Sequence, residues 1–311
     1  MNITVVGAGV TGLVTALTLE ERGHDVQVVA AATGEAITSS VAGACWFPYR
    51  AGPPDRVARW AADTRAWLTQ LVGEPGVAAI TGYEITHDAA RPDAPAPWWA
   101  AHITVDRAPA PVTGGPPAWR YGSIAIEPAR FLPWLASRLR RPIAHRAVDA
   151  LDAEPGDVVV HCAGLAARRL AGDTAMIALL GQVAIVEPGA VDRAITITDE
   201  RDPDALFYAI PRSRELVLGG CSLPWSGASA CAWDVPSAAL PIDPALTDRI
   251  LAQAAALGLA IGPLVRVRAG LRPYRPEIRL ERAGRIIHNY GHGGAGYTLC
   301  RGCAEAVADL L

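Results

Sequence analysis

Three glycines near the N-terminus have the spacing of a turn that binds a phosphate group. They form the pattern Gly7-x-Gly9-x-x-Gly12, which encloses Val10 and Thr11. The first glycine permits a tight turn, the second lets the backbone approach a pyrophosphate, and the third lets a helix pack closely on a strand. The amides and dipole at the start of that helix would stabilise the phosphate charge. The pattern therefore predicts a dinucleotide site.

The position that usually binds the adenosine ribose lacks its acid. In dinucleotide folds an Asp or Glu about 20 residues after the glycine turn contacts the ribose. Here the second predicted strand ends in Ala30-Ala31-Ala32, the nearest acid is Glu35, and no arginine stands there to bind a 2′-phosphate. Nothing in this segment favours NAD or NADP, so a nicotinamide dehydrogenase is supported by the glycine turn alone.

An arginine next to proline could bind a carboxylate near the C-terminal end. Arg272 precedes Pro273, and a second proline follows at Pro276. A planar guanidinium can bind a carboxylate through two parallel hydrogen bonds, and the prolines restrict the backbone that carries it. Arg272 is therefore the first candidate for substrate binding.

Other kinds of chemistry find less support in the sequence. The chain contains no lysine, which excludes a Schiff base on an enzyme amine and with it pyridoxal phosphate catalysis. Cys300 and Cys303 have the spacing of a redox or zinc pair, but one pair supplies only half of a tetrahedral zinc shell. His288 and His292 are four residues apart, yet the nearby glycines argue against a helix that would bring them onto one metal. We expect reduced cysteines and no metal.

These groups require a scaffold of alternating strands and helices. Residues 3–6, a helix up to residue 22, and residues 25–29 predict a βαβ unit, and the apolar run 157–161 predicts a strand that returns to the same sheet. Residues 50–126 are rich in Pro and Trp and indicate a separate lobe with one helix near 56–72. Strands at 182–186 and 215–219 predict an antiparallel sheet in the second lobe. A helix is expected at 246–257 and another after the glycine cluster at 291–296.

Charge and hydropathy narrow the class of protein further. The formal net charge of −3 argues against a broad basic surface for nucleic acid or anionic lipid. A strand-like run replaces the pattern of a signal peptide at the N-terminus, and no apolar run approaches the roughly 20 residues that span a bilayer. We expect a cytoplasmic protein without a nucleic-acid or membrane partner, with a homodimer as one option for its assembly.

Motifs along nearly the whole chain resemble those of the FAD-dependent D-amino-acid oxidase family. Residues 270–281 (GLRPYRPEIRLE) and 287–296 (IHNYGHGGAG) resemble its C-terminal signature, and residues 39–49 (SSVAGACWFPY) resemble its flavin-side segment. Shorter matches follow in order at 160–164, 181–182, 208–211 and 218–220. The resemblance implies an α/β fold with a Rossmann-type FAD-binding domain built from residues 1–50, 127–180 and 265–311. A substrate-binding domain with a mainly antiparallel sheet would comprise residues 51–126 and 181–264.

The resemblance also implies roles for individual residues. Arg272 and Tyr208 would bind the carboxylate of the substrate, and the backbone carbonyl of Gly294 would accept a hydrogen bond from its amine. Asp204 stands where the family has a second tyrosine, and it would repel acidic substrates or attract cationic side chains such as that of D-Arg. The residues expected to bind FAD are Gly7, Gly9, Val10, Thr11, Gly12, Ser39, Ser40, Ala44, Cys45, Trp46, Cys162, Gly164, Arg279, Gly293, Gly296, Tyr297 and Thr298.

The implied reaction is the oxidative deamination of a D-amino acid to an α-keto acid, ammonia and hydrogen peroxide, with hydride transfer to FAD and oxygen as the acceptor. Its catalysis would rest on orientation, and no side chain is expected to act as acid or base. A D-aspartate oxidase is an alternative, in which Arg201 would bind the side-chain carboxylate, although Ser222 replaces its second arginine. A glycine or sarcosine oxidase is another. A flavin-binding protein with lost or retuned catalysis is a third, because the ribose acid is missing and Asp204 and Phe47 depart from the family pattern.

Overall fold

The first 30 residues form the βαβ unit that the sequence predicted. The computed structural model describes residues 1–203, 205–225 and 237–311 of the chain. In it β1 (Asn2–Val6) pairs in parallel with β2 (Asp25–Ala30), and α1 (Val10–Glu21) begins directly after the glycine turn. On its other side β1 pairs in parallel with β7 (Val158–His161), which confirms that this strand returns the chain to the first sheet.

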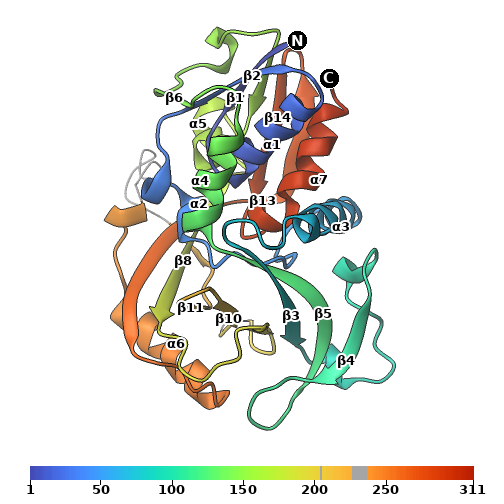
Figure 1. Cartoon of the computed structure of the whole chain (residues 1–311), viewed down its shortest axis with the longest axis vertical. Helices are drawn as coiled ribbons and strands as arrows, with labels where there is room; N and C mark the ends of the chain where they lie inside the picture. Colours follow the sequence, from blue (N-terminus) through green and yellow to red (C-terminus); the bar gives the residue numbers. More distant parts are fainter. Residues whose placement is uncertain (204, 226–236) are drawn as a thin grey trace.

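One continuous sheet connects the dinucleotide end of the molecule to the predicted substrate lobe (Figure 1). Its strands are parallel around β1 and mainly antiparallel beyond β14. The pairing of 182–186 with 215–219 in an antiparallel ladder is confirmed. The order runs β6 (Ala144–His145), β2, β1, β7, β14 (Ile286–His292), β13 (Leu264–Ala283), β8 (Ile177–Val186), β11 (Leu216–Gly219), β10 (Phe207–Pro211), β9 (Ile195–Asp199), β3 (Val77–Ile85), β5 (Pro117–Ile126) and β4 (Val105–Pro109), with β12 (Leu223–Pro224) added beside β8.

Strand β13 links the two ends of this sheet. Its Arg-rich and Pro-rich part, residues 270–282, was not predicted as a strand, and Pro273 and Pro276 lack the N–H that a ladder needs. In the structure the strand pairs with β8 up to Tyr274, shifts register, and pairs continuously with β14 from Arg279 onward. The prolines thus lie where the strand passes from one partner to the other. Arg272 is thereby placed at the junction of the two halves of the sheet.

Helices cover the dinucleotide end. Helix α7 (Gly296–Ala308) packs against both α1 and α3 (Pro54–Gln70), so α3 lies on this end although its sequence was assigned to the substrate domain. The predicted division of the chain into two domains stays a prediction, since the sheet runs through both. The other helices are α2 (Thr38–Val41), α4 (Pro128–Arg138), α5 (Ala167–Leu170) and α6 (Pro244–Ala256), with short 3₁₀ turns at Gly34–Ala36, Asp88–Ala90, Trp98–Ala100, Leu151–Ala153, Gly164–Ala166 and Ser237–Ala239.

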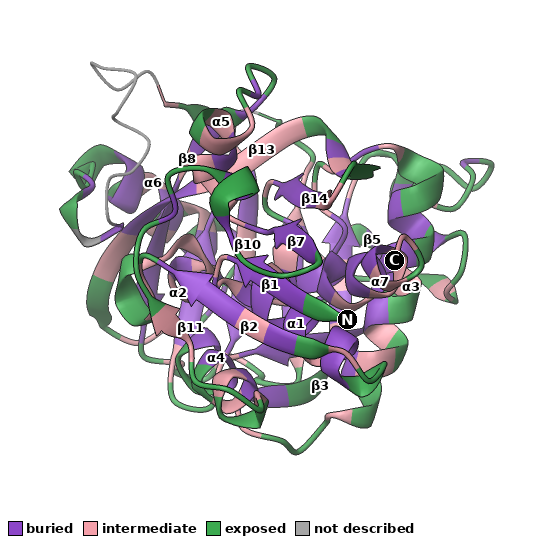
Figure 2. Ribbon diagram, turned by 90° about the horizontal axis from the view of Figure 1, so that it is seen from above, coloured by how far each residue is buried: buried purple, intermediate pink, exposed green. Residues whose placement is uncertain are grey.

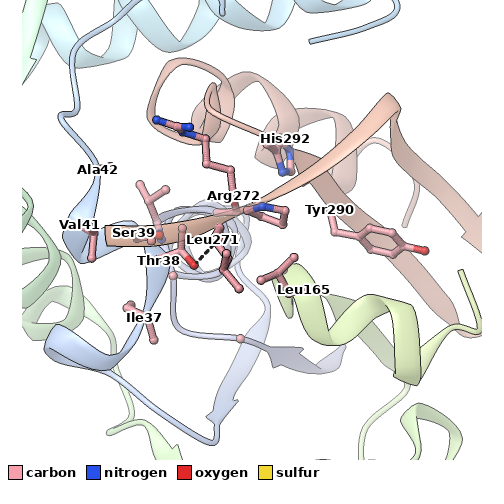
Figure 3. Close-up of a pocket in the computed structure, with 18 of the residues that line it drawn as sticks. Ile37, Thr38, Ser39, Val41, Ala42, Leu165, Leu271, Arg272, Tyr290 and His292 are labelled. Carbon is pink, nitrogen blue, oxygen red and sulfur yellow. Dashed lines mark hydrogen bonds between the residues drawn. The ribbon is translucent and has the colours of Figure 1, made fainter. Parts of the chain in front are cut away.

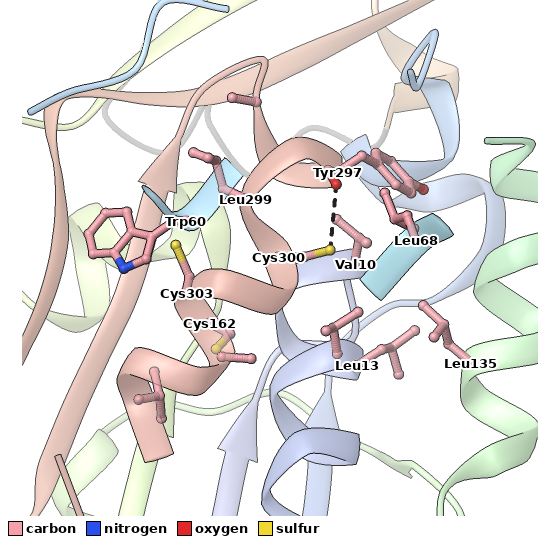
Figure 4. Close-up of a cluster of buried hydrophobic side chains, with 14 of the residues drawn as sticks. Val10, Leu13, Trp60, Leu68, Leu135, Cys162, Tyr297, Leu299, Cys300 and Cys303 are labelled. Carbon is pink, nitrogen blue, oxygen red and sulfur yellow. Dashed lines mark hydrogen bonds between the residues drawn. The ribbon is translucent and has the colours of Figure 1, made fainter. Parts of the chain in front are cut away.

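The largest core lies between these helices and the parallel strands (Figure 2). Cys300 and Cys303 are fully buried in it, near Cys162 and the side chain of Trp60 (Figure 4). Both are free thiols, and burial raises the pKa of Cys300 to about 12. A thiol that stays protonated is a poor nucleophile and metal ligand, so this pair serves as packing.

The lobe at residues 50–126 differs most from the prediction. Its Pro-rich and Trp-rich sequence indicated one helix and long connections, yet it also contains the strands β3, β4 and β5. Trp119 and Tyr121 of β5 are buried, and the Tyr121 ring packs edge-on against the rings of Trp46 and Trp99. No helix in the described part of the chain is both long and apolar enough to cross a membrane.

Candidate active site

A cavity of about 590 Å³ runs from the glycine turn to the antiparallel part of the sheet. One end is bounded by β1, the start of α1 and the turn after β7. The other end is bounded by β13, β10 and the glycine cluster that precedes α7. Figure 3 shows the α2 segment and β13 beside each other in this wall, with the Thr38 hydroxyl bonded to the carbonyl of Leu271 at 2.9 Å. A single cavity therefore joins the predicted dinucleotide turn to the predicted substrate residues.

Close backbone contacts require glycine in the turn after β1. A Cβ on Gly12 would lie 1.9 Å from the carbonyl oxygen of Gly7, and a Cβ on Gly7 would lie 2.4 Å from the carbonyl oxygen of Cys162. Gly7 also has a φ of +117°, which disfavours any residue with a side chain. Gly12 thus acts as the sequence predicted, by letting α1 approach β1, and it does not itself line the cavity.

Ser39 extends the turn from the opposite side. Its hydroxyl accepts a hydrogen bond from the amide of Val10 at 3.1 Å, and it lines the cavity beside Gly9. Ser40 does not line the cavity, because the next side chain of this short helix points away and donates to the carbonyl of Gly34. Ser39 thus reaches the cavity and Ser40 does not, and the binding of FAD by either residue stays a prediction.

The ribose end is apolar, as the sequence indicated. Ala30, Ala31 and Ala32 line the cavity there together with Val148. Arg169 also lines it and donates to the carbonyl of Val148 at 3.1 Å. The sequence analysis missed this cation, although its position soon after the Cys162-Ala163-Gly164 turn could have indicated it. It is the charged side chain nearest to this end among the described lining residues.

Arg272 and Tyr208 meet at the other end of the cavity. The Arg272 guanidinium donates to the carbonyl of Cys221 at 2.7 Å, and Arg272 lines the cavity next to Tyr208. Burial raises the pKa of the Tyr208 phenol, although the positive charge of Arg272 opposes that rise. The phenol is therefore neutral, and it can donate a hydrogen bond next to the cation.

Both side chains lie flat over glycines of neighbouring strands. A Cβ on Gly181 of β8 would lie 2.4 Å from Cζ of Arg272, and a Cβ on Gly219 of β11 would lie 2.3 Å from the hydroxyl of Tyr208. Any other residue at these positions would displace the groups that the sequence assigned to substrate binding. The sequence analysis noted both glycines as matches but gave them no role, because their contacts depend on strand register.

The glycine cluster before α7 completes this end. Gly293, Gly294 and Gly296 line the cavity, and Tyr297 lines it while its hydroxyl donates to the carbonyl of Ser39 at 2.9 Å. Helix α7 begins at Gly296, so the positive end of its dipole points toward the cavity. A Cβ on Gly294 would lie 2.9 Å from the ring of Tyr49, a lining residue that the sequence analysis did not single out.

The structure brings most of the predicted residues to this one cavity. Those that line it are Gly7, Gly9, Val10, Thr11, Ser39, Ala44, Cys45, Cys162, Gly164, Tyr208, Arg272, Gly293, Gly294, Gly296 and Tyr297. Asp204 lies outside the described residues. Ser40, Trp46, Arg279 and Thr298 are not brought to the cavity.

The three remaining exceptions have structural partners that explain their positions. Trp46 is fully buried and donates to the carbonyl of Ala61 in α3 at 2.7 Å. Arg279 bonds Glu281 at 2.7 Å and the hydroxyl of Tyr290 at 2.8 Å, on the part of β13 beyond the register shift. The Thr298 hydroxyl bonds the backbone of Phe47 at both N–H and carbonyl, so it fixes a lining residue rather than lining the cavity itself.

A buried carboxyl lies behind this end of the cavity. Burial, reinforced by the negative charge of Glu200, raises the pKa of Glu84 to about 8 from an ordinary value of 4.5. Glu84 is 5% exposed and sits on β3. At neutral pH its side chain is therefore mainly a protonated acid.

Replacing this carboxyl should make folding less sensitive to pH. A raised pKa in the folded state means that Glu84 costs no stability below pH 4.5, and that the free energy of unfolding falls as the pH rises toward about 8. We expect Glu84→Gln to stabilise the protein by about 4 kcal/mol at pH 8 and by less than about 1 kcal/mol at pH 5. Urea unfolding of both proteins at the two pH values measures this, and an equal difference at both would contradict it.

Comparison with known proteins shows which family the chain belongs to. Residues 2–310 match the family described as FAD dependent oxidoreductase. The chain is 37% identical to a D-amino-acid oxidase of Rubrobacter xylanophilus over 98% of this chain and 94% of the relative, and 35% identical to a D-amino-acid oxidase of Streptomyces coelicolor over 99% and 96%. The fold is similar to that of glycine oxidase from Bacillus cereus, with a TM-score of 0.73, 19% identity, and coverage of 99% of this chain and 94% of that one.

Proposed function

Because the chain belongs to the D-amino-acid oxidase family of FAD-dependent oxidoreductases, we propose that it oxidises the bond between the α-carbon and the amine of D-amino acids. Hydrolysis of the resulting imine gives an α-keto acid and ammonia, and oxygen is reduced to hydrogen peroxide. One observation carries the proposal: Arg272 and Tyr208 meet, each over a glycine, in the cavity that begins at the dinucleotide turn.

The cavity fits FAD. The end of the cavity at the glycine turn has the close packing and the helix start that a pyrophosphate requires. From there the cavity extends to the N-terminus of α7. The residues proposed to hold the cofactor are Gly7, Gly9, Val10, Thr11, Ser39, Ala44, Cys45, Cys162, Gly164, Arg169, Gly293, Gly296 and Tyr297. When bound, FAD supplies the ring that accepts the α-hydrogen as a hydride and passes the electrons to oxygen.

Orientation of the substrate is the main contribution of the protein. The Arg272 guanidinium binds the carboxylate, and the Tyr208 hydroxyl donates to the same group. The backbone carbonyl of Gly294 accepts a hydrogen bond from the neutral amine. With the carboxylate and the amine both fixed, only one enantiomer can direct its α-hydrogen to the same face, which is the basis of the preference for D-amino acids.

The titratable side chains around the cavity do not suit a general base. Burial lowers the pKa of His292 to about 4, so its ring is a weak proton acceptor. Burial also raises the pKa of Tyr49 and of Tyr208, so both phenols remain protonated at neutral pH. These shifts support a reaction without a side-chain base, as the sequence analysis expected.

The proposal is tested with a panel of D- and L-amino acids that includes D-Ala, D-Val, D-Arg, D-Asp, glycine and sarcosine. We expect peroxide release with D-amino acids and none with their L-enantiomers. Anaerobic mixing should bleach the flavin absorbance with the same substrates. The absence of bleaching with every D-amino acid would contradict the proposal and favour a flavin-binding protein without this activity.

A D-aspartate oxidase receives little support from the geometry. In such an enzyme Arg201 would bind the side-chain carboxylate of the substrate. Here Arg201 is exposed and bonds both oxygens of Asp199 at 2.9 and 2.7 Å. That ion pair leaves it poorly placed to bind a substrate. The cytoplasmic location and the homodimer stay predictions from the sequence.

A further inference from the structure

Six side chains with buried polar atoms gather beyond the substrate end of the cavity. They are Tyr49, Glu84, Trp99, Tyr121, Glu200 and Ser222. Trp99 pairs with Glu84 and Ser222 with Tyr49, whereas Tyr121 and one carboxylate oxygen of Glu200 have no hydrogen-bond partner among the described residues. The carboxyls of Glu84 and Glu200 both lie within electrostatic range of the Tyr121 hydroxyl, and Glu200 also lies within range of Tyr49. The six side chains therefore form one neighbourhood, which we call the polar compartment.

Strand register places this compartment next to the cavity. Thr198 on β9 lines the cavity, and side chains two residues apart on an extended chain face the same side, so Glu200 follows it on that face. Glu84 on β3 stands opposite Thr198 in the parallel pairing of β3 with β9. Tyr49 also lines the cavity, and its hydroxyl belongs to the compartment. The compartment thus lies behind two residues of the cavity wall.

Its composition favours a ligand that donates several hydrogen bonds. Buried polar atoms in folded proteins are nearly all paired, so the unpartnered Glu200 oxygen and Tyr121 hydroxyl beside a cavity indicate a place that is filled by water or a ligand. Two carboxyls and three hydroxyls can accept hydrogen bonds there. An apolar group in contact with them would leave the charge of Glu200 without a partner, which is unfavourable.

The charges around Glu200 allow it to bind a cation. Burial raises the pKa of Glu200 and the positive charge of Arg50 opposes that rise, yet no ion pair within 4 Å joins Glu200 to a described residue, and Arg50 is exposed. Arg272 is assigned to the substrate carboxylate. Glu84, whose acid is mainly protonated at neutral pH, adds a neutral donor and acceptor rather than a second negative charge.

Resting on the proposed function, we propose that the polar compartment binds the end of the substrate side chain and selects D-amino acids with long cationic side chains. Glu200 is the residue that accepts the charge, and the hydroxyls of Tyr49 and Ser222 are its neutral partners. The Tyr49 ring and the Arg272 side chain both adjoin Gly294, and the Tyr49 hydroxyl belongs to the compartment, so a substrate side chain must be long to pass this ring and reach Glu200. D-Arg, D-Lys and D-ornithine are the class of substrate expected.

Kinetics with matched substrates test the role of charge. We expect kcat/KM for D-Arg to exceed that for D-citrulline, its neutral counterpart, and for D-norleucine by about tenfold or more. Glu200→Gln should lower the ratio of D-Arg to D-citrulline by about tenfold. Glu74→Gln is the matched control, because Glu74 is an exposed carboxyl in the turn before β3. It should leave that ratio within about twofold of the wild-type value.

A binding experiment separates failure of this inference from failure of the proposed function. The probe is 5-guanidinopentanoate, which has the chain of D-Arg without the amine that would be oxidised, and 5-ureidopentanoate is its neutral counterpart. Calorimetry on the FAD-loaded protein should show about tenfold tighter binding of the guanidino compound, and Glu200→Gln should remove that difference. Equal affinities in the wild-type protein would overturn the inference even if D-amino acids are oxidised. Tighter guanidino binding without any oxidation would instead contradict the proposed function.

Discussion

Replacing Arg272 with alanine is expected to lower kcat/KM for D-amino acids by about two to three orders of magnitude. The guanidinium lines the end of the cavity and is the cation assigned to the substrate carboxylate. Removing one partner of a buried charge pair typically costs about 2–5 kcal/mol, since the other charge is left without a partner. Peroxide release measured under steady-state conditions gives the ratio, and the flavin absorbance of the purified variant shows whether FAD is retained.

Two further variants make the assignment of Arg272 specific. Arg282→Ala removes an exposed arginine from the same strand, whose guanidinium bonds the carbonyls of Leu310 and Leu311, and it should leave kcat/KM nearly unchanged. Gly181→Ala keeps Arg272 but places a methyl group 2.4 Å from its Cζ, so it should lower kcat/KM by moving the guanidinium. Wild-type kcat/KM in Arg272→Ala would refute the role of this residue.

Gly12→Ala is expected to weaken FAD binding by about a hundredfold. The added Cβ would lie 1.9 Å from the carbonyl oxygen of Gly7, so α1 must move away from β1. The clash is with backbone rather than with a flexible side chain, which places its cost near the upper end of the usual range for overpacking, about 3 kcal/mol. The same displacement moves the helix start that faces the pyrophosphate. Titration of the apoprotein with FAD, followed by fluorescence quenching, measures the dissociation constant.

A change at the other end of the same helix provides the control. Gly23 follows the C-terminus of α1 with a φ of +86° and has open space around it. Asparagine tolerates this conformation, so Gly23→Asn should keep the wild-type affinity for FAD. If Gly12→Ala bound FAD as tightly as Gly23→Asn, close packing of α1 against β1 would not be a requirement of the site.

The buried carboxyls of Glu84 and Glu200 connect the stability of the protein to its proposed substrate specificity. Glu84 lies on the face of β3 that adjoins the substrate end, and its raised pKa reflects burial beside Glu200. A site that keeps such buried carboxyls loses stability as the pH rises from about 4.5 to about 8, and in the proposal above it gains the ability to discriminate among side chains. The Glu84→Gln stability measurement and the Glu200→Gln kinetics therefore address the same compartment through independent quantities.

The sequence by itself determined the features that depend on local residue type. The glycine spacing at 7–12, the apolar runs at 3–6, 25–29 and 157–161, and the glycine cluster before the last helix all lead to the observed elements. Each of these rests on a turn, a helix start or a strand within a short stretch of chain. Arg272 and Tyr208, singled out because the motifs around them resemble those of a known family, both line one cavity, and their role in substrate binding stays a prediction.

The tertiary structure alone decided which side chains reach the cavity. Ser39 reaches it and Ser40 does not, and Arg279 bonds Tyr290 and Glu281 instead of lining the wall. Gly181 and Gly219 became site residues because strand register lays Arg272 and Tyr208 across them. The direction of a side chain and the partner of a strand depend on contacts between segments far apart in the chain. Such contacts are difficult to predict from a single sequence. Local turns and periodicities can be predicted because they depend on residues close together in the chain.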